Sequence, residues 1–304
     1  MEGGHDMSKR NVYSTNQAAG KGRLVIVPTP LGNLGDVSKR AMDALSAVDV
    51  VACEDTRVTG KLLSALGISG AKLERMDEAT LSRKGLELVE RIAVEGISVA
   101  YCTDAGMPGI SDPGQRLIDQ AYARHVPVAV LPGATAASTA YVASGFSCPA
   151  FYFGAFAPRK ASERKRLFES LKELDAALVF YDSPHRIADT LSAVAAAFPL
   201  RQVAVCRELS KLHEETVRGL APDVAAEFAA RAEEGRVRGE FVFVVNAPDK
   251  QEAQQDALSN IEAARALIAE EKEAGTLTNK DLVQAVRDVF GLSRNEAYAL
   301  VNEE

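Results

Sequence analysis

Acidic side chains follow two apolar runs that are typical of buried strands. Glu54 and Asp55 come directly after Val50–Cys53, and Asp104 lies two residues after a second such run. A carboxylate held at the end of a strand can act as a general base that removes a proton from a hydroxyl group. An Asp in this position also often caps its own turn, and Arg57 could hold Asp55 in a surface salt bridge. The residue types alone leave both roles open.

Asp104 also lies in an unusual loop. The sequence Cys102–Gly114, CTDAGMPGISDPG, holds three glycines, two prolines and two aspartates. A strand-to-helix connection of about two to six residues needs no such density of glycine. Two further loops, Pro28–Asp36 and Leu131–Ser138, follow apolar runs and carry glycines with short side chains. Ligands bind open α/β sheets beyond the carboxyl ends of the strands, so the three loops predict one wall of a ligand pocket.

Common cofactor and metal motifs do not occur in the sequence. The first apolar run is not followed by G-x-G-x-x-G, and neither a phosphate-binding G-x-x-x-x-G-K-[ST] nor a G-x-S-x-G nucleophile elbow is present. No His or Cys cluster has zinc-binding spacing, so no metal site is predicted. The residues alone therefore predict a pocket for a nucleoside-like or similar organic ligand.

Short apolar runs alternate with amphipathic helical patterns along most of the chain. Such alternation predicts βαβ units around a largely parallel sheet, and fewer helices per strand after residue 148 predict a second, mixed α/β domain. Asp112 with Pro113, and Ser183 with Pro184, provide the N-cap and N1 residues of two expected helices. The predicted organisation is a disordered N-terminal tail (1–22), an N-terminal α/β domain (23–147), a C-terminal mixed α/β domain (148–248), a polar linker or exposed helix (249–275) and a small helical C-terminal segment (276–304).

The C-terminal segment carries two helix signatures. Thr278 can cap a helix that ends at Gly291, and Ser293 with Glu296 forms a capping box for a second helix. Two helices across a tight turn resemble a nucleic-acid-binding helix-turn-helix, but most such pairs only pack together. The pattern leaves the role of this segment open.

Composition indicates a cytoplasmic enzyme. Hydrophobic residues make up 47% of the 304 positions, and no apolar run approaches the roughly 18 residues of a membrane helix. The four cysteines form no C-x-x-C pair, so free thiols in a reducing compartment are expected. A net charge of −7 argues against broad coating of nucleic acid. The segment Ala157–Arg166 nevertheless holds five basic residues and one acid, as either a solvated helix face or a phosphate-binding patch would.

Seven segments in order along the chain resemble the ribosomal RNA small-subunit methyltransferase I family of the tetrapyrrole methylase superfamily. They lie between Arg23 and Val245 and read VPTPLGNLGDVSKRAMDAL, CEDTRVTGKLL, TDAGMPGISDPG, LPGATAAS, YDSPHRI, RELSKLHEETVRG and GEFVFVV. The resemblance implies two α/β domains with S-adenosylmethionine in the cleft between them. It also implies a homodimer, without membrane attachment, that methylates a cytidine 2′-hydroxyl in 16S rRNA of the small ribosomal subunit.

The resemblance further implies roles for single residues. Cofactor binding is expected at Leu31, Asp104, Ala105, Gly106, Ile110, Thr135, Ala136, Tyr181, Leu209 and Phe241. Base catalysis is expected from Glu54, Asp55 or Asp104. RNA contact is expected at Arg57, Arg159, Lys160, Arg164, His185 and Arg186, the last two because cations in the first turn of a helix oppose its dipole and so indicate another use. Asp112 is interpreted as a helix cap.

Two alternatives remain at this point. One is a methyltransferase of the same superfamily that acts on a tetrapyrrole intermediate; the EDTR, SPHR and HEET segments and the basic patch argue against it. The other is a non-catalytic RNA-binding or assembly protein on the same scaffold, which binding of S-adenosylmethionine at ordinary cellular concentrations would argue against.

Overall fold

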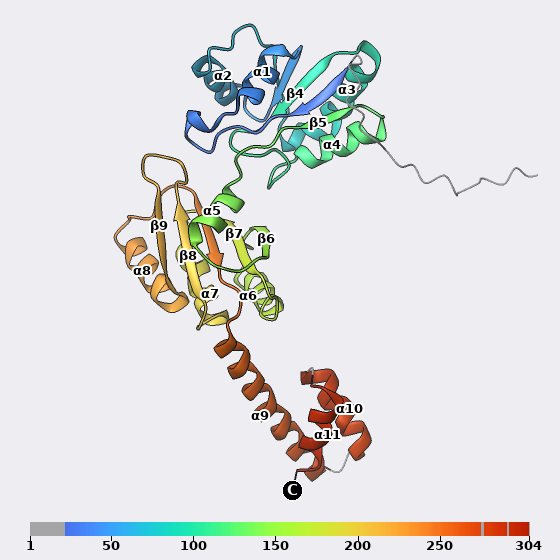
Figure 1. The fold of residues 1–304 in the computed structure, drawn as a ribbon, viewed down its shortest axis with the longest axis vertical. Helices are drawn as coiled ribbons and strands as arrows, with labels where there is room; N and C mark the ends of the chain where they lie inside the picture. Colours follow the sequence, from blue (N-terminus) through green and yellow to red (C-terminus); the bar gives the residue numbers. More distant parts are fainter. Residues whose placement is uncertain (1–21, 275–276, 291, 304) are drawn as a thin grey trace, which may run out of the picture.

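A computed structural model describes residues 22–274, 277–290 and 292–303, which form two α/β units and a helical unit (Figure 1). The tail predicted over residues 1–22 lies outside the described residues up to position 21. Figure 1 shows the three units following one another along the longest axis, with the helical unit farthest from the first sheet. The two α/β units therefore hold the surfaces that can face each other across a cleft.

The first unit is built on a parallel sheet of five strands in the order β3-β2-β4-β1-β5. Because every pair is parallel, the carboxyl ends of all five strands meet at one edge, where the three glycine-containing loops begin. The strand β2 covers the predicted apolar run in full. The strands are β1 (Arg23–Ile26), β2 (Val50–Cys53), β3 (Leu73–Arg75), β4 (Ser98–Cys102) and β5 (Val128–Val130).

Amphipathic helices cover both faces of this sheet. Leu24 and Ile26 pack against the layer formed by α3 and α4, whereas Val25 packs against the layer formed by α1 and α2. Burial on both faces explains why the strands appear in the sequence as continuous apolar runs. The helices are α1 (Lys39–Ala47), α2 (Thr56–Ala65), α3 (Glu78–Glu95) and α4 (Gly114–Ala123), and a 3-10 turn, η1 (Leu34–Asp36), lies in the first loop.

The second unit has a mixed sheet in the order β6-β7-β10-β8-β9, in which only β6 and β7 are parallel. The helices α6 (Ala161–Ser170), α7 (Ile187–Ala197) and α8 (Ala221–Glu233) cover one face with a core rich in phenylalanine. The strands are β6 (Phe151–Phe156), β7 (Ala177–Asp182), β8 (Gln202–Arg207), β9 (Glu215–Leu220) and β10 (Phe241–Val245). This arrangement matches the mixed α/β domain expected from the sequence.

The helix α5 (Ala136–Ser144) covers the other face of the second sheet, where Ala137 and Ala140 pack against Val179 and Val242. We expected the domain boundary between residues 147 and 148, which would place α5 in the first unit. The chain instead crosses to the second sheet in the loop before α5, and the small side chains of Ala137 and Ala140 let this helix lie close to that sheet. The predicted cap at Ser183 also differs, since α7 begins at Ile187 with Arg186 in the cap position.

Three helices, α9 (Lys250–Ala274), α10 (Asn279–Phe290) and α11 (Arg294–Val301), share a small core of their own. The predicted capping box of Ser293 and Glu296 is confirmed. The polar segment after residue 249 is therefore helical, and its apolar positions Ala264 and Ile268 hold the last two helices. Within the described ranges, no helix is long and apolar enough to cross a bilayer. The four cysteines are free, and three of them are buried, as expected.

Candidate active site

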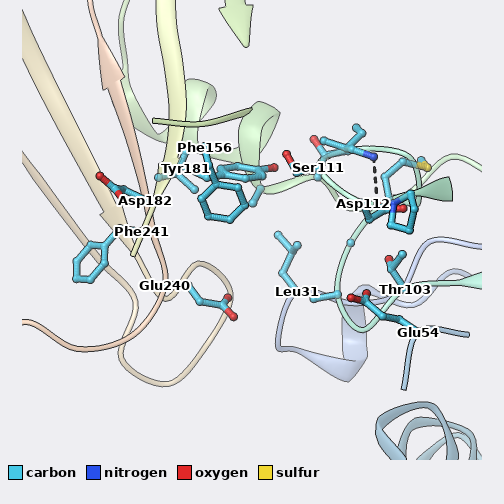
Figure 2. A pocket seen from close by; sticks show the side chains of 18 of the residues that line it. Leu31, Glu54, Thr103, Ser111, Asp112, Phe156, Tyr181, Asp182, Glu240 and Phe241 are labelled. Carbon is cyan, nitrogen blue, oxygen red and sulfur yellow. Dashed lines mark hydrogen bonds between the residues drawn. The ribbon is translucent and has the colours of Figure 1, made fainter. Parts of the chain in front are cut away.

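A cavity of about 320 Å³ lies between the carboxyl edge of the first sheet and the facing end of the second sheet (Figure 2). Its size is that of a small-molecule site. Figure 2 shows Leu31 near its centre, with Glu54 and Thr103 on one side and Phe241 and Glu240 on the other. The lining residues are Leu31, Glu54, Glu78, Thr103, Ala105, Gly106, Met107, Ile110, Ser111, Asp112, Pro113, Thr135, Ala136, Phe156, Tyr181, Asp182, Glu240, Phe241 and Val242.

Most residues predicted to bind the cofactor line this cavity, but Asp104 and Leu209 do not. The Leu209 side chain is only 6% exposed and packs in the core beneath α5, and a cofactor contact at Leu209 stays a prediction. The Asp104 carboxylate instead accepts a hydrogen bond of 3.3 Å from the backbone N–H of Asp55. The predicted residues that line the cavity are Leu31, Ala105, Gly106, Ile110, Thr135, Ala136, Tyr181 and Phe241.

Gly106 joins the first two glycine-containing loops. Its N–H donates to the carbonyl oxygen of Thr29 at 3.1 Å, and the Thr29 N–H donates back to Gly106 at 3.0 Å. Gly106 has a φ of +83°, and a Cβ atom there would lie 3.2 Å from Leu31 Cδ2 and 3.5 Å from the carbonyl oxygen of Ala134. The Gly106 N–H and carbonyl are therefore already paired, and this pairing holds a cradle formed by Leu31, Ala105 and Gly106 at the cavity wall.

Asp112 folds the second half of the same loop. Its carboxylate accepts hydrogen bonds of 2.8–3.1 Å from the backbone N–H groups of Gly109, Ile110 and Gly114. A Cβ atom at Gly114 would lie 2.9 Å from the Gly109 nitrogen, so this close turn requires glycine. The predicted N-cap is one residue early, because α4 begins at Gly114 with Pro113 in the cap position. Asp112 is therefore an organiser of the loop rather than a simple helix cap.

The structure distinguishes Asp55 from the other two acidic candidates. Asp55 is the N-cap of α2 and accepts a hydrogen bond of 2.8 Å from the Arg57 N–H. Its carboxylate also pairs with the Arg57 guanidinium at 2.6 Å. These bonds hold the pKa of Asp55 well below its usual range, which makes it a weak base, and it does not line the cavity. The prediction of Asp55 as a catalytic base is therefore not supported.

Glu54 lines the cavity beside Thr103, and Figure 2 shows its carboxylate near the Leu31 loop. Partial burial, followed by the charges of Asp104 and Asp112, raises the pKa of Glu54. Partial desolvation and the Asp55 charge also raise the pKa of Asp104. A carboxylate with a raised pKa is a stronger base. Glu54 is the one of the three whose position and basicity both fit proton removal in the cavity.

The second sheet supplies an aromatic wall. A bulge in β6 between Phe153 and Phe156, with Ala155 at a φ of +55°, places Phe156 edge-on against Tyr181 with ring centroids 5.5 Å apart. The Tyr181 hydroxyl accepts a hydrogen bond of 3.2 Å from the Ala137 N–H. That bond ties the start of α5, which lines the cavity, to the second sheet.

Of the residues predicted to contact RNA, Arg57, Arg159, Lys160 and His185 are exposed, and RNA contact stays a prediction for them. Arg164 differs, since its side chain lies inside the fold. It is 7% exposed and donates to the carbonyl oxygen of Pro158 at 3.2 Å. The prediction of an RNA contact for Arg164 is corrected, because this guanidinium braces the loop before α6.

Arg186 is also engaged within the fold. It pairs with the buried carboxylate of Asp182 at 2.6 Å and donates to the carbonyl oxygen of Ala157 at 3.1 Å. The ion pair explains why a cation is tolerated at the start of α7, because the nearby Asp182 compensates it. The structure thus gives Arg186 a positioning role at the end of β7, which the sequence did not indicate.

Among the lining residues that were not predicted as site residues are Thr103, Phe156 and Glu240. Thr103 has a buried hydroxyl without a hydrogen-bond partner among the described residues. Its position between a strand end and Asp104 could have identified it as a site residue from the sequence. Phe156 lines the cavity because of the bulge in β6, which no pattern in the sequence predicts. Across the described part of the chain, no group of three or more potential metal ligands is gathered.

The comparisons with known proteins agree with this geometry. Residues 23–225 match the family model of tetrapyrrole (corrin/porphyrin) methylases, so the chain belongs to that family. A uroporphyrin-III-C-methyltransferase from Thermus thermophilus superposes with a TM-score of 0.54 at 20% identity, over 74% of this chain and 94% of that one. At this identity the likeness shows the fold alone, and it confirms the fold class predicted from the sequence.

Two relatives define the branch of that family. A ribosomal RNA small subunit methyltransferase I from Halalkalibacterium halodurans is 37% identical over 295 residues, which are 96% of this chain and 98% of the relative. A protein of the same name from Bacillus subtilis is 38% identical over 247 residues, 81% of this chain and 82% of the relative. The chain belongs to the ribosomal RNA small subunit methyltransferase I family, as its seven segments predicted.

Proposed function

We propose that this chain transfers a methyl group from S-adenosylmethionine to the ribose 2′-hydroxyl of a cytidine in 16S rRNA of the small ribosomal subunit. The observation that supports this most directly is the cavity between the two sheets. There the cradle around Leu31 and the aromatic wall of Phe156 and Tyr181 lie in the same cavity as Glu54, whose pKa is raised. The relatives of this chain are named as rRNA methyltransferases.

The cavity fits the proposed cofactor in shape and chemistry. A side chain at Gly106 would press against Leu31, so glycine at this position adds no bulk to the cradle. Phe156 and Tyr181 offer ring surfaces suited to a flat, partly apolar group such as adenine. When bound, S-adenosylmethionine supplies an electrophilic methyl group on a sulfonium. Leu31, Ala105, Ile110 and Thr135 would hold it against the first unit.

The chain itself has two tasks in this reaction. Methyl transfer is an in-line displacement, so the loops must position donor and acceptor, and the paired Gly106–Thr29 backbone gives them a fixed geometry. The ribose hydroxyl is a poor acid and gains from a nearby base. We assign that task to Glu54, with Asp104 next to it, because burial and neighbouring carboxylates raise the pKa of Glu54 at the cavity wall.

The test is methyl transfer to small subunits purified from a strain that lacks the corresponding methyltransferase. Nucleosides of the product rRNA would be separated and identified by mass spectrometry. The proposal predicts one 2′-O-methylcytidine per subunit, and free 16S rRNA assayed in parallel shows whether assembly is required. Methylation of a base, or of a uroporphyrinogen offered as an alternative substrate, would contradict the proposal. Sedimentation of the protein would test the predicted homodimer.

A further inference from the structure

A second cavity, of about 540 Å³, lies on the second unit and is lined by four arginines, two glutamates and a glycine. We call it the arginine pocket: Arg207, Glu215, Arg231, Glu234, Gly235, Arg236 and Arg238. Like charges gathered around one space repel each other, and the whole chain has a net charge of −7. A surplus of guanidinium groups around an open cavity therefore needs an explanation.

Two of the arginines build the pocket. The Arg231 side chain is 16% exposed and pairs with Glu215 at 2.9 Å and with Glu227 at 2.7 Å. Arg207 donates through Nε to the carbonyl oxygen of Arg238 at 2.7 Å. Its Nη1 lies 3.7 Å from Glu215. These contacts fix the base of the pocket and the backbone of the segment that carries Arg238.

The other two arginines are available to a ligand. Arg236 is exposed and pairs with the equally exposed Glu234. Arg238 is exposed and forms no ion pair within residues 22–274, 277–290 and 292–303. Val237 between them packs against the core under α7 and α8, which anchors the segment. Guanidinium groups on an anchored backbone are suited to phosphate oxygens, which they can bind through two parallel hydrogen bonds.

The pocket lies next to the candidate active site. Arg238 precedes Glu240, which lines the active-site cavity, by two residues. Arg207 is the register partner of Phe241, which also lines that cavity. Figure 1 shows that the connection between β8 and β9 extends from this end of the sheet toward the first unit. An RNA strand that places a ribose in the cavity has phosphates on both sides of that nucleotide, and these must cross the neighbouring surface.

We propose that the arginine pocket binds a backbone phosphate of the RNA substrate close to the nucleotide that is methylated, with Arg236 and Arg238 as the contacting residues. The inference rests on the proposed function, since it names a binding site for the same substrate. It adds a contact region distinct from the basic segment around α6.

The experiment compares two double variants of the full chain with equal charge change. Arg236→Gln/Arg238→Gln removes the exposed pair. Arg83→Gln/Arg124→Gln removes two exposed, glutamate-paired arginines of the first unit, one on α3 and one at the C-cap of α4. Binding to small subunits is measured over a range of salt concentrations, and methyl transfer is measured at saturating substrate. S-adenosylmethionine affinity serves as a check that each variant is folded.

The pocket variant is expected to bind subunits at least about tenfold more weakly, and the slope of its salt dependence should fall by about 0.7 for one lost phosphate contact. Its rate at saturating substrate and its cofactor affinity should stay within about twofold, because the pocket acts in substrate binding alone. The control variant should bind like the wild type. Equal binding by the pocket variant and the wild type would overturn the inference and leave the proposed function intact. A wild type that binds RNA through these arginines but transfers no methyl group would overturn the function only.

Discussion

The two walls of the active-site cavity are built by different means. The wall from the first unit is a set of loops held by backbone pairing, such as Thr29 with Gly106, and by the carboxylate of Asp112. The wall from the second unit consists of side chains, with Phe156 and Tyr181 projecting from strands. The loop wall therefore depends on backbone shape and carries the proposed base Glu54, whereas the aromatic wall depends on apolar contact. Substitutions in the loop wall should therefore reduce the methyl-transfer rate or the cofactor affinity far more than substitutions in the aromatic wall reduce cofactor affinity.

The largest expected effect is that of Glu54→Gln. General-base assistance contributes about 10²–10⁴-fold to a rate, so single-turnover methyl transfer with cofactor and substrate saturating should fall by a factor in that range. The wild-type rate should also fall on the acid side, with a midpoint above the ordinary glutamate pKa, because burial raises the pKa of Glu54.

Asp55→Asn is the matched control for this change. It removes the same charge one residue away, and Asn remains a good N-cap for α2. Its rate should stay close to that of the wild type. Equal losses in the two variants would show that the charge around α2, and not a base in the cavity, limits the reaction.

The cradle gives the next largest effect. Gly106→Val places a β-branched side chain at a φ of +83° beside Leu31, so S-adenosylmethionine affinity should fall at least about tenfold, or roughly 1.4 kcal/mol. Gly67→Val is the control, because Gly67 has a similar φ of +72° and no atom within 4 Å of its Cβ position. Calorimetric titration of both folded variants separates crowding of the cradle from backbone strain. Unchanged S-adenosylmethionine affinity in Gly106→Val would show that this loop is not part of the cofactor site.

The contrast between the walls also explains what the sequence could predict. The apolar run of β2 and the glycine-containing loops were predicted because burial and tight turns impose patterns along the chain itself. The aromatic wall was only partly predicted, since Phe156 depends on a bulge. Arg164 was misinterpreted because it donates to nearby carbonyl oxygens, a partner that sequence spacing does not show.

The acidic candidates show the same limit at the level of single residues. Sequence position placed Glu54, Asp55 and Asp104 at one sheet edge, and that edge is where they lie. It could not tell which of these carboxylates faces the cavity, because a side-chain rotation decides this. The α5 helix raises a related problem, since its mostly small residues form no marked apolar stripe that would indicate which sheet it covers.

A smaller effect is expected in the aromatic wall. Phe156→Ala should weaken S-adenosylmethionine binding by about two- to tenfold, the range of roughly 0.5–1.5 kcal/mol of an aromatic contact. Phe151→Ala is the control, because Phe151 lies on the same strand, is 42% exposed and stacks on Tyr141 away from the cavity lining. If both variants bind the cofactor like the wild type, the second sheet contributes no ring contact and the wall serves only to close the cleft.

The smallest effect is on stability, and it concerns Glu54 again. Its raised pKa means that the folded chain holds the Glu54 proton more tightly than the unfolded chain does. The resulting stabilisation is present below the unfolded pKa, near 4.3, and is lost as the pH rises through the higher folded pKa. Glu54→Gln, which cannot ionise, should therefore be more stable than the wild type at neutral pH, and this advantage should shrink as the pH approaches 4.5.

Urea unfolding of both proteins at several pH values between about 4.5 and 7.5 measures this difference. Screening by the open cavity should keep it below about 1 kcal/mol at neutral pH. A variant that is slower in methyl transfer and yet more stable would show that the loop wall keeps an unfavourable charge for use in the reaction. A Gln variant less stable than the wild type at neutral pH would mean that the Glu54 carboxylate forms a favourable contact in the fold, and the assignment of a base to this wall would then lose its electrostatic basis.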